Sequence, residues 1–240
     1  MAAFELLGTP TPGGLLIVVD HASDHVPADI DLGIAPALLA THIAVDIGVA
    51  AIARAMLGAG TAAFLATASR LVCDLNREAH APAIIPIASD GHAIPGNALD
   101  HAGHEARLAR FYHPYHTALE ASIAAVRPGL ILSLHSFTPS LASHPQQQRP
   151  WHVGVLYNAD ERAPRLALPL LAAEEGLVVG DQQPYSGRLL NATMNRHAEG
   201  HGIPYLGVEV RQDLIADAAG QGQWAARLGR LCGQVMGALA

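Results

Sequence analysis

Short runs of large aliphatic residues alternate along the chain with longer segments that have apolar residues at helical spacing. The run LILSLHSF at residues 130–137 and the run LLIVV at residues 15–19 are typical of strands buried on both faces, because large aliphatic residues fill consecutive positions. The first run ends on a histidine flanked by serines, which a core strand does not require. Strands are expected at residues 15–19, 61–76, 129–137, 151–158, 176–187 and 203–211, with 61–76 forming two short strands or one bent strand.

Amphipathic helices are expected between these strands. Trp224, Leu228 and Leu231 lie at helical spacing in a closing segment, about residues 217–239. Helices are also expected at residues 35–60, 98–127, 164–176 and 193–202, with Pro114 breaking or restarting the second of these. Residues 78–97 are rich in Pro, Gly, Ser and Asp, which predicts a long loop of the kind that is often functional.

The alternation of strands and helices predicts an α/β fold. We expect a single three-layer domain over residues 1–240, with a central, mostly parallel (mixed) sheet between two layers of helices. In such sheets the aliphatic strands are covered on both faces, which explains why their apolar residues are continuous.

Composition narrows the classes of function. Half of the residues are hydrophobic and 15% are charged, as in compact globular proteins. The net charge of -7 argues against nucleic acid and against an anionic membrane as partners. No apolar run reaches membrane-spanning length and the N-terminus lacks a signal-peptide pattern, so we expect a cytoplasmic protein. Cys73 and Cys232 form no metal or disulfide pattern, and the oligomeric state stays open.

Several expected strands end in polar side chains that can carry chemistry. These are His21 and Asp24 after the first strand, Asp74, Asn76 and Arg77 after the run RLV, His135 after LILSL, and Glu209 after YLGV. In open α/β sheets, ligands bind beyond the carboxyl ends of the strands. We therefore expect these side chains to converge on one site.

The combination of residue types suits metal-dependent hydrolysis of an amide. Two histidines and a carboxylate can hold zinc and leave a fourth position for water, and the metal lowers the pKa of that water. A separate carboxylate can take the proton of the water and pass it to the leaving nitrogen. An arginine nearby would hold an anionic substrate by a bidentate contact.

Each of these residues also has a structural explanation. A histidine at a strand end is usually a hydrogen-bonded polar residue, and Glu209 alternates with valines, as on the solvent face of an edge strand. Asn76 is a common helix-capping residue type. His42 and Asp46 lie four residues apart on an expected helix, where a local hydrogen-bonded pair and a role beside the metal are both open.

The motifs resemble those of the N-formylglutamate amidohydrolase family. The matching segments are DHASDHVP, HIAVDIG, SRLVCDLNR, SDGHAIPGN, FYHPYH, SLHSF, QPYSG and GVEVRQDLI, spread over about residues 20–215. Their order and combination carry the resemblance. It implies zinc-dependent hydrolysis of N-formyl-L-glutamate, or of a close N-acyl amino acid, to formate and the amino acid. Asp181 stands where we expect the family to have asparagine.

A more distant resemblance to the zinc carboxypeptidases implies a fold like theirs and a role for each residue. HASD at 21–24, DLNR at 74–77, HSF at 135–137 and EVR at 209–211 follow the order of the carboxypeptidase motifs. The implied zinc ligands are His21, Asp24 and His135, the implied α-carboxylate binders are Asn76 and Arg77, and Glu209 is the implied general base and acid. Because Asp24 is one methylene shorter than the glutamate of that motif, water or another acid such as Asp46 is the alternative ligand.

The implied substrate is a small anionic N-acyl amino acid with two carboxylates. Arg77 would hold one, and Arg70 is the candidate for the other, with a salt bridge as its alternative explanation. Two other functions stay open: a carboxypeptidase-like hydrolase of small peptides, and a binding module that kept the fold without catalysis. The presence of His21, His135 and Glu209 together argues against the binding module.

Overall fold

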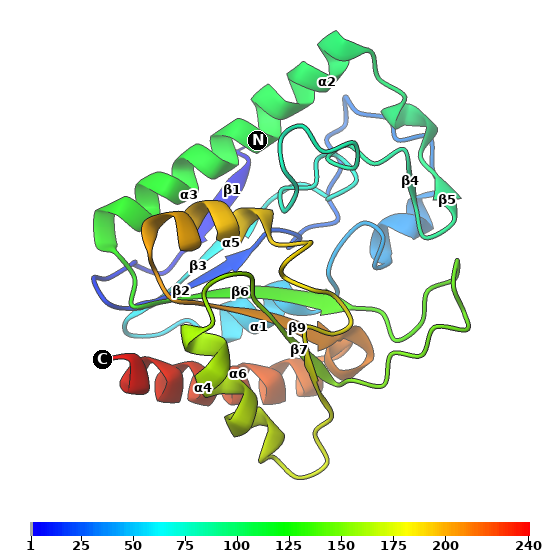
Figure 1. Ribbon diagram of the computed structural model, residues 1–240. Helices are drawn as coiled ribbons and strands as arrows, with labels where there is room; N and C mark the ends of the chain where they lie inside the picture. Colours follow the sequence, from blue (N-terminus) through cyan, green and yellow to red (C-terminus); the bar gives the residue numbers. More distant parts are fainter. Residues whose placement is uncertain (1) are drawn as a thin grey trace.

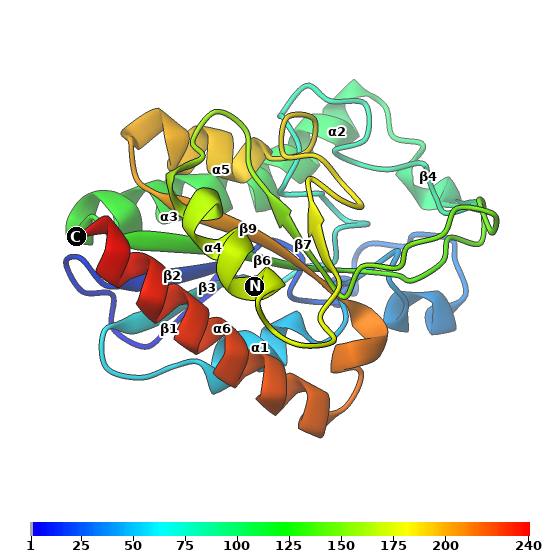
Figure 2. The ribbon, with the colours of Figure 1, turned by 60° about the horizontal axis from the view of Figure 1, so that its bottom comes forward.

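Three layers make up the molecule, with a sheet between two layers of helices (Figure 1). The computed structural model describes residues 2–240. One face of the sheet is covered by α3 (His113–Val126) and α5 (Ala192–His197), and the other by α1 (Val49–Ala55), α4 (Arg162–Ala172) and α6 (Ala218–Leu239), whereas α2 (His101–Arg107) extends past the strands (Figure 1). Figure 2 turns the layer of α1, α4 and α6 toward the viewer. The predicted three-layer α/β architecture is confirmed.

Seven strands form the sheet, in the order β1-β3-β2-β6-β9-β7-β8. Their bounds are Phe4–Leu7 (β1), Leu15–Val19 (β2), Thr61–Ala66 (β3), Leu130–Phe137 (β6), Val153–Leu156 (β7), Val179–Asp181 (β8) and Tyr205–Arg211 (β9). β3, β2, β6 and β9 are parallel neighbours, whereas β1 and β7 run antiparallel to β3 and β9. The carboxyl ends of the four parallel strands therefore meet at one edge, where α/β proteins bind ligands.

The aliphatic runs form strands because both faces of the sheet are covered. All five residues of β2 and all eight residues of β6 are buried. Successive side chains of a strand point to opposite faces. Ile17 and Leu132 accordingly belong to the core that contains residues of α1 and α6, whereas Leu16 and Ile131 belong to the core that contains residues of α3.

The helix expected at residues 98–127 is continuous but changes its hydrogen-bond pattern at the centre. α2 passes through a π-helical turn, Leu108–Tyr112, directly into α3 (Figure 1). Pro114 lies in the first turn of α3. A π turn directly precedes it, and a proline is tolerated in the first turn of a helix. Pro114 thus restarts the helix rather than ending it.

The prediction of one helix over residues 35–60 is wrong in its extent. The segment contains a 3-10 helix at Pro36–Ala40, turns over residues 41–48, and only then α1. Gly48 marks the break, with a φ of 84°, and a side chain at this position would meet the Ile215 carbonyl oxygen at 2.3 Å. Close packing against the segment after β9 thus overrides the helical spacing of the apolar residues.

One strand expectation changes, and one strand of the structure was not expected. Residues 61–76 contain one strand, β3, and the apolar Leu71 and Val72 that follow it lie in turns although both are buried. β1 is an edge strand that the pattern does not predict, because its four residues are short of a clear run and only partly buried.

Residues 78–97 form the long loop that their composition predicts. The loop includes a small hairpin of β4 (Ala88–Ser89) and β5 (His92–Ala93). Short 3-10 helices lie at Pro95–Asn97, Glu199–His201 and Gln212–Ile215. Among residues 2–240, no helix combines the length and the apolar character needed to cross a bilayer.

Candidate active site

A cavity of about 130 Å³ lies at the carboxyl ends of the parallel strands. β6 and β9 pair in a register that places His135 directly opposite Glu209. His21 follows β2, which neighbours β6 on its other side. The lining of the cavity includes every predicted site residue except Asp24.

Three buried side chains at this edge could hold a metal ion: His21, Asp46 and His135. Asp46 Oδ2 lies 2.9 Å from His135 Nδ1 and 3.3 Å from His21 Nδ1. Two ligand atoms of a tetrahedral zinc ion are roughly 3.3 Å apart, given zinc–ligand bonds of about 2.0–2.1 Å. The spacing of these atoms fits a zinc ion.

Asp46 reaches this position because the turns of residues 41–48 are tied to the sheet. Its backbone N–H donates to the His21 carbonyl oxygen at 3.0 Å, at the end of β2. Its Oδ2 accepts the N–H of Ser136 at 3.3 Å, near the end of β6. The carboxylate is therefore held by the backbone of two neighbouring strand ends.

Two further carboxylates lie on the far side of the histidines. Asp74 Oδ1 is 2.8 Å from His21 Nε2, and Asp20 Oδ2 is 3.6 Å from His135 Nε2. The Tyr115 hydroxyl donates to Asp20 Oδ1 at 2.7 Å. Carboxylates placed in this way orient a ligating imidazole and favour the tautomer that leaves the other nitrogen free for a metal. In both histidines that other nitrogen is Nδ1, the atom near Asp46.

The carboxylates also control the charge of the two histidines. Burial and Arg70 act to lower the pKa of His21, but Asp74 and Asp46 outweigh them and raise it. Burial likewise acts to lower the pKa of His135, and Asp20 and Asp46 raise it well above its ordinary value. Both imidazoles therefore face carboxylates that favour their protonated forms in the metal-free protein.

Glu209 is the carboxyl group of the cavity that has a free oxygen. Its side chain is buried, and Oε2 has no hydrogen-bond partner among residues 2–240. Burial raises the pKa of the Glu209 carboxyl group to about 7; His135 opposes this shift and Asp46 adds to it. A carboxyl group with a pKa near neutrality can accept and donate a proton in turn, as a general base and acid must.

Two arginines line the cavity, and both lie beside Asp74. Arg70 donates to Asp74 Oδ2 at 2.7 Å and to Asp46 Oδ1 at 3.3 Å, which is the salt-bridge alternative for this residue. Arg77 Nε lies 3.7 Å from Asp74 Oδ2, and its side chain is 30% exposed. Arg77 is therefore the more available of the two for an anionic ligand.

Asn76 lines the cavity and caps a helix at the same time. Its Oδ1 accepts the N–H of Thr193 at 3.1 Å, in the first turn of α5. This bond satisfies one of the backbone donors that a helix leaves unpaired at its N-terminus. The capping role that we expected as an alternative therefore coexists with a place in the cavity.

Residues 13–216, which carry every side chain named above, match the sequence model of N-formylglutamate amidohydrolase. The chain belongs to the N-formylglutamate amidohydrolase family. A gene product of Agrobacterium tumefaciens has a similar structure, with a TM-score of 0.93 and 29% identity over 100% of this chain and 96% of that chain. N-formylglutamate amidohydrolase from Ralstonia eutropha shares the fold, with a TM-score of 0.74 and 23% identity over 100% of this chain and 98% of that chain. No sequence among curated proteins matches.

Family membership supports amide hydrolysis as the activity.

The structure places Asp24 away from the site. Asp24 is exposed and lies outside the cavity lining, whereas Asp46 joins the two histidines. The expectation assumed that HASD brings its first and last residues together. Residues 22–27 have no helical structure, so positions three apart do not share a face.

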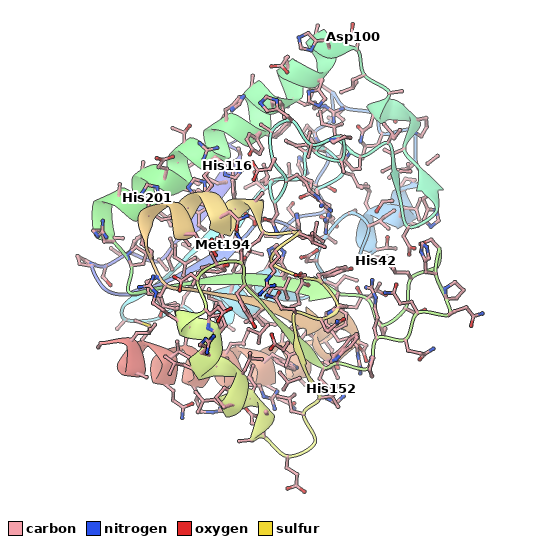
Figure 3. The ribbon with its side chains drawn as sticks, in the orientation of Figure 1. His42, Asp100, His116, His152, Met194 and His201 are labelled. Atoms are coloured by element: carbon pink, nitrogen blue, oxygen red, sulfur yellow. The ribbon has the colours of Figure 1, made fainter. Side chains whose placement is uncertain are left out.

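His42, which is labelled in Figure 3, lines the cavity, but its hydrogen-bond partner differs from the one expected. Its Nε2 lies 3.0 Å from Asp90 Oδ2 in the β4–β5 hairpin. The turns of residues 41–48 replace the expected helix and remove the four-residue pairing with Asp46.

Sequence reasoning missed three residues of the site and its surroundings: Asp20, Tyr115 and Tyr185. Asp20 directly precedes His21 at a strand end, and this adjacency is a signal that could have found it. Tyr115 comes from α3, and no local pattern connects it with Asp20.

Asp181, which stands where we expected asparagine in the family, lies outside the cavity lining. It accepts a hydrogen bond from the Tyr157 hydroxyl at 2.8 Å.

Proposed function

We propose that this amidohydrolase is zinc-dependent and removes the formyl group of N-formyl-L-glutamate, or the acyl group of a close N-acyl amino acid. The products are formate and the free amino acid. One observation carries the proposal: His21, Asp46 and His135 share a cavity with Glu209, and one carboxyl oxygen of Glu209 has no hydrogen-bond partner among residues 2–240. Hydrolysis of an amide by a metal enzyme needs both parts, a metal-binding group and a separate carrier of the proton.

The residues present fit a zinc ion. His21 and His135 offer Nδ1 and Asp46 offers Oδ2, a nitrogen and oxygen donor set typical of catalytic zinc sites. When bound, zinc would polarise the substrate carbonyl and lower the pKa of a water molecule. Asp74 and Asp20 would keep the two imidazoles oriented for binding.

Glu209 carries the proton in this proposal. As a carboxylate it accepts a proton from the attacking water, and as a carboxylic acid it delivers that proton to the nitrogen of the breaking C–N bond. The formyl carbon leaves as formate and the nitrogen leaves as the amino group of the amino acid. Oε2 of Glu209 is suited to this role because no other residue of the described chain occupies it.

Arg77 is the candidate for the substrate α-carboxylate, with Asn76 beside it in the same turn. Two side chains contact the Leu75 carbonyl oxygen and fix this turn. His116 Nε2 lies 3.0 Å from this oxygen, and the Thr193 hydroxyl donates to it at 3.2 Å. A turn fixed in this way can keep the guanidinium oriented toward the cavity.

Metal analysis combined with a substrate panel tests the proposal. The purified protein is analysed for bound metal and assayed with N-formyl, N-acetyl and peptide substrates. We expect about one zinc per chain and fastest turnover of an N-formyl amino acid. His21→Ala and His135→Ala should lose metal and activity together, whereas the control His25→Ala, an exposed residue outside the cavity lining, should retain both. Full metal occupancy in both site variants, or turnover of peptides alone, would contradict the proposal.

A further inference from the structure

Arg149 is a buried arginine without a carboxylate partner. The residue is 5% exposed. Within residues 2–240, its hydrogen bonds go to the Thr138 carbonyl oxygen at 3.3 Å and to the Tyr185 hydroxyl at 3.0 Å, and its buried Nε has no partner. A buried charge without a counter-charge is costly in free energy. An anion close to Arg149 would offset that cost.

Tyr185 connects Arg149 to the cavity. The guanidinium carbon lies 5.0 Å from the centre of the Tyr185 ring, and Tyr185 lines the cavity together with Thr138. A guanidinium only donates hydrogen bonds, so the Tyr185 oxygen is the acceptor and its own O–H proton is not used in this contact. No side chain or carbonyl group of the described chain accepts that proton. Burial raises the pKa of the Tyr185 hydroxyl, with Glu209 adding to the shift, so the proton stays on the oxygen at neutral pH.

The segment that carries Tyr185 is fixed against β7. The backbone N–H of Gln182 donates to the Val155 carbonyl oxygen at 2.9 Å. Gly154 allows the close approach, because a side chain there would meet the Gln183 carbonyl oxygen at 2.0 Å. The Tyr185 hydroxyl is therefore held in a defined place at the cavity, as a specificity contact requires.

The two arginines that line the cavity, Arg70 and Arg77, do not provide this contact. Arg70 is bonded to Asp74 at 2.7 Å and to Asp46 at 3.3 Å, so its charge is already balanced by two carboxylates. Arg77 is the group that we assign to the α-carboxylate. A substrate with a second carboxylate needs a further donor, and Tyr185 with Arg149 behind it offers both a proton and a positive charge.

We propose that Tyr185 and Arg149 form an anion subsite that takes the side-chain carboxylate of the N-acyl amino acid. The inference rests on the proposed function and assigns two residues to the second carboxylate of its substrate. Tyr185 donates its O–H to the carboxylate. Arg149 is a positioning residue, which holds the Tyr185 oxygen and supplies the compensating charge.

Two nearly isosteric substrates test the subsite: N-formyl-L-glutamate and N-formyl-L-glutamine, in which a neutral amide replaces the side-chain carboxylate. We expect wild type to prefer the glutamate substrate in kcat/KM. Tyr185→Phe keeps the ring under Arg149 and should reduce this preference by about ten- to a hundredfold, the range of one hydrogen bond to a charged group. The loss should lie mainly in KM for the glutamate substrate, and it should be smaller for the glutamine substrate.

A double-mutant cycle separates positioning from a general structural role. Arg149→Met should reduce the same preference, Arg149→Lys should restore part of it, and Arg149→Met combined with Tyr185→Phe should cost little more than the worse single variant. Tyr157→Phe and Arg227→Met are matched controls: the first loses a tyrosine hydroxyl bonded to Asp181, and the second loses an arginine stacked on Trp224, both outside the cavity lining. Equal losses on both substrates in Tyr185→Phe, or fully additive losses in the double variant, would overturn the proposal.

Binding of the reaction products keeps the test independent of turnover. Calorimetry on the zinc-loaded protein should show tighter binding of L-glutamate than of L-glutamine in wild type, and similar binding of the two in Tyr185→Phe. If the wild-type protein binds L-glutamate and L-glutamine equally, the proposed subsite is wrong, even if the protein hydrolyses N-formyl amino acids. Absence of turnover with the binding preference intact would overturn the proposed function and leave the subsite standing.

Discussion

The buried pair His116–His197 should make the protein lose stability as the pH falls from neutral. His116, on α3, and His197, on α5, are both almost completely buried, and His116 Nδ1 lies 2.8 Å from His197 Nε2 (Figure 3 labels His116). His116 Nε2 lies 3.0 Å from the Leu75 carbonyl oxygen, which can only accept, so Nε2 carries the proton. Nδ1 is then the acceptor for the N–H of His197. A second proton on His116 would place two N–H groups against each other.

The size of the effect follows from the pKa values. Burial lowers the pKa of both histidines from 6.5 to about 4. Between these values the unfolded chain binds more protons than the folded one, so stability is complete above the unfolded pKa and is lost as the pH falls toward the folded pKa. Between about pH 7 and pH 5 the free energy of unfolding should fall by about 2 kcal/mol for each histidine.

Urea unfolding of wild type and His197→Gln over this pH range measures the effect. The glutamine amide can still donate to His116 Nδ1 but does not titrate, so the variant should lose less stability on acidification, by about 2 kcal/mol. His201→Gln is the matched control, since His201 lies four residues further along the chain and is exposed. Parallel pH dependence of wild type and His197→Gln would refute the reasoning, because the pair would then not be the group that titrates.

Three further predictions concern the cavity. Asp46→Asn should lower zinc content strongly while Asp24→Asn leaves it unchanged, and the reverse result, measured by metal analysis, would restore the HASD motif as the source of the third ligand. Glu209→Gln should retain zinc but lose about two to four decades in kcat, and near-normal turnover would show that another group carries the proton. Arg77→Ala and Arg77→Lys should both lower kcat/KM for N-formyl-L-glutamate with zinc retained. Wild type should reject the α-amide of that substrate, and equal kcat/KM for acid and amide would exclude Arg77 as the carboxylate clamp.

Much of the fold and part of the site follow from local patterns. The aliphatic runs of β2 and β6 predict buried strands, and the polar residues that end them, His21 and His135, lie together because parallel strands end at the same edge. Glu209 follows from the same argument, since β9 is the next parallel neighbour of β6. These predictions depend only on strand direction and not on the course of any loop.

The rest depends on backbone that the pattern cannot specify. The sequence motif favours Asp24 as the third ligand, with Asp46 as the alternative. The structure brings Asp46 to the histidines through turns that end at the left-handed Gly48, which packs against Ile215 and precedes α1. Helical spacing over residues 35–60 conceals this break, because the apolar residues of the turns are buried too. Arg149 lies in a loop whose sequence, ASHPQQQRP, has no signal for a buried charge.

The charges of the site account for why His135 ends a core strand. Asp20, Asp46 and Asp74 have pKa values lowered below the ordinary value, despite burial, which acts to raise them, so all three are anionic. In the metal-free protein these carboxylates face Arg70 and two imidazoles whose pKa values are raised. A divalent cation held by the two imidazoles would place positive charge beside the same carboxylates in exchange for any protons on the ligating nitrogens. A histidine at a strand end is suited to that exchange, because the fixed backbone lets it change partner without changing place.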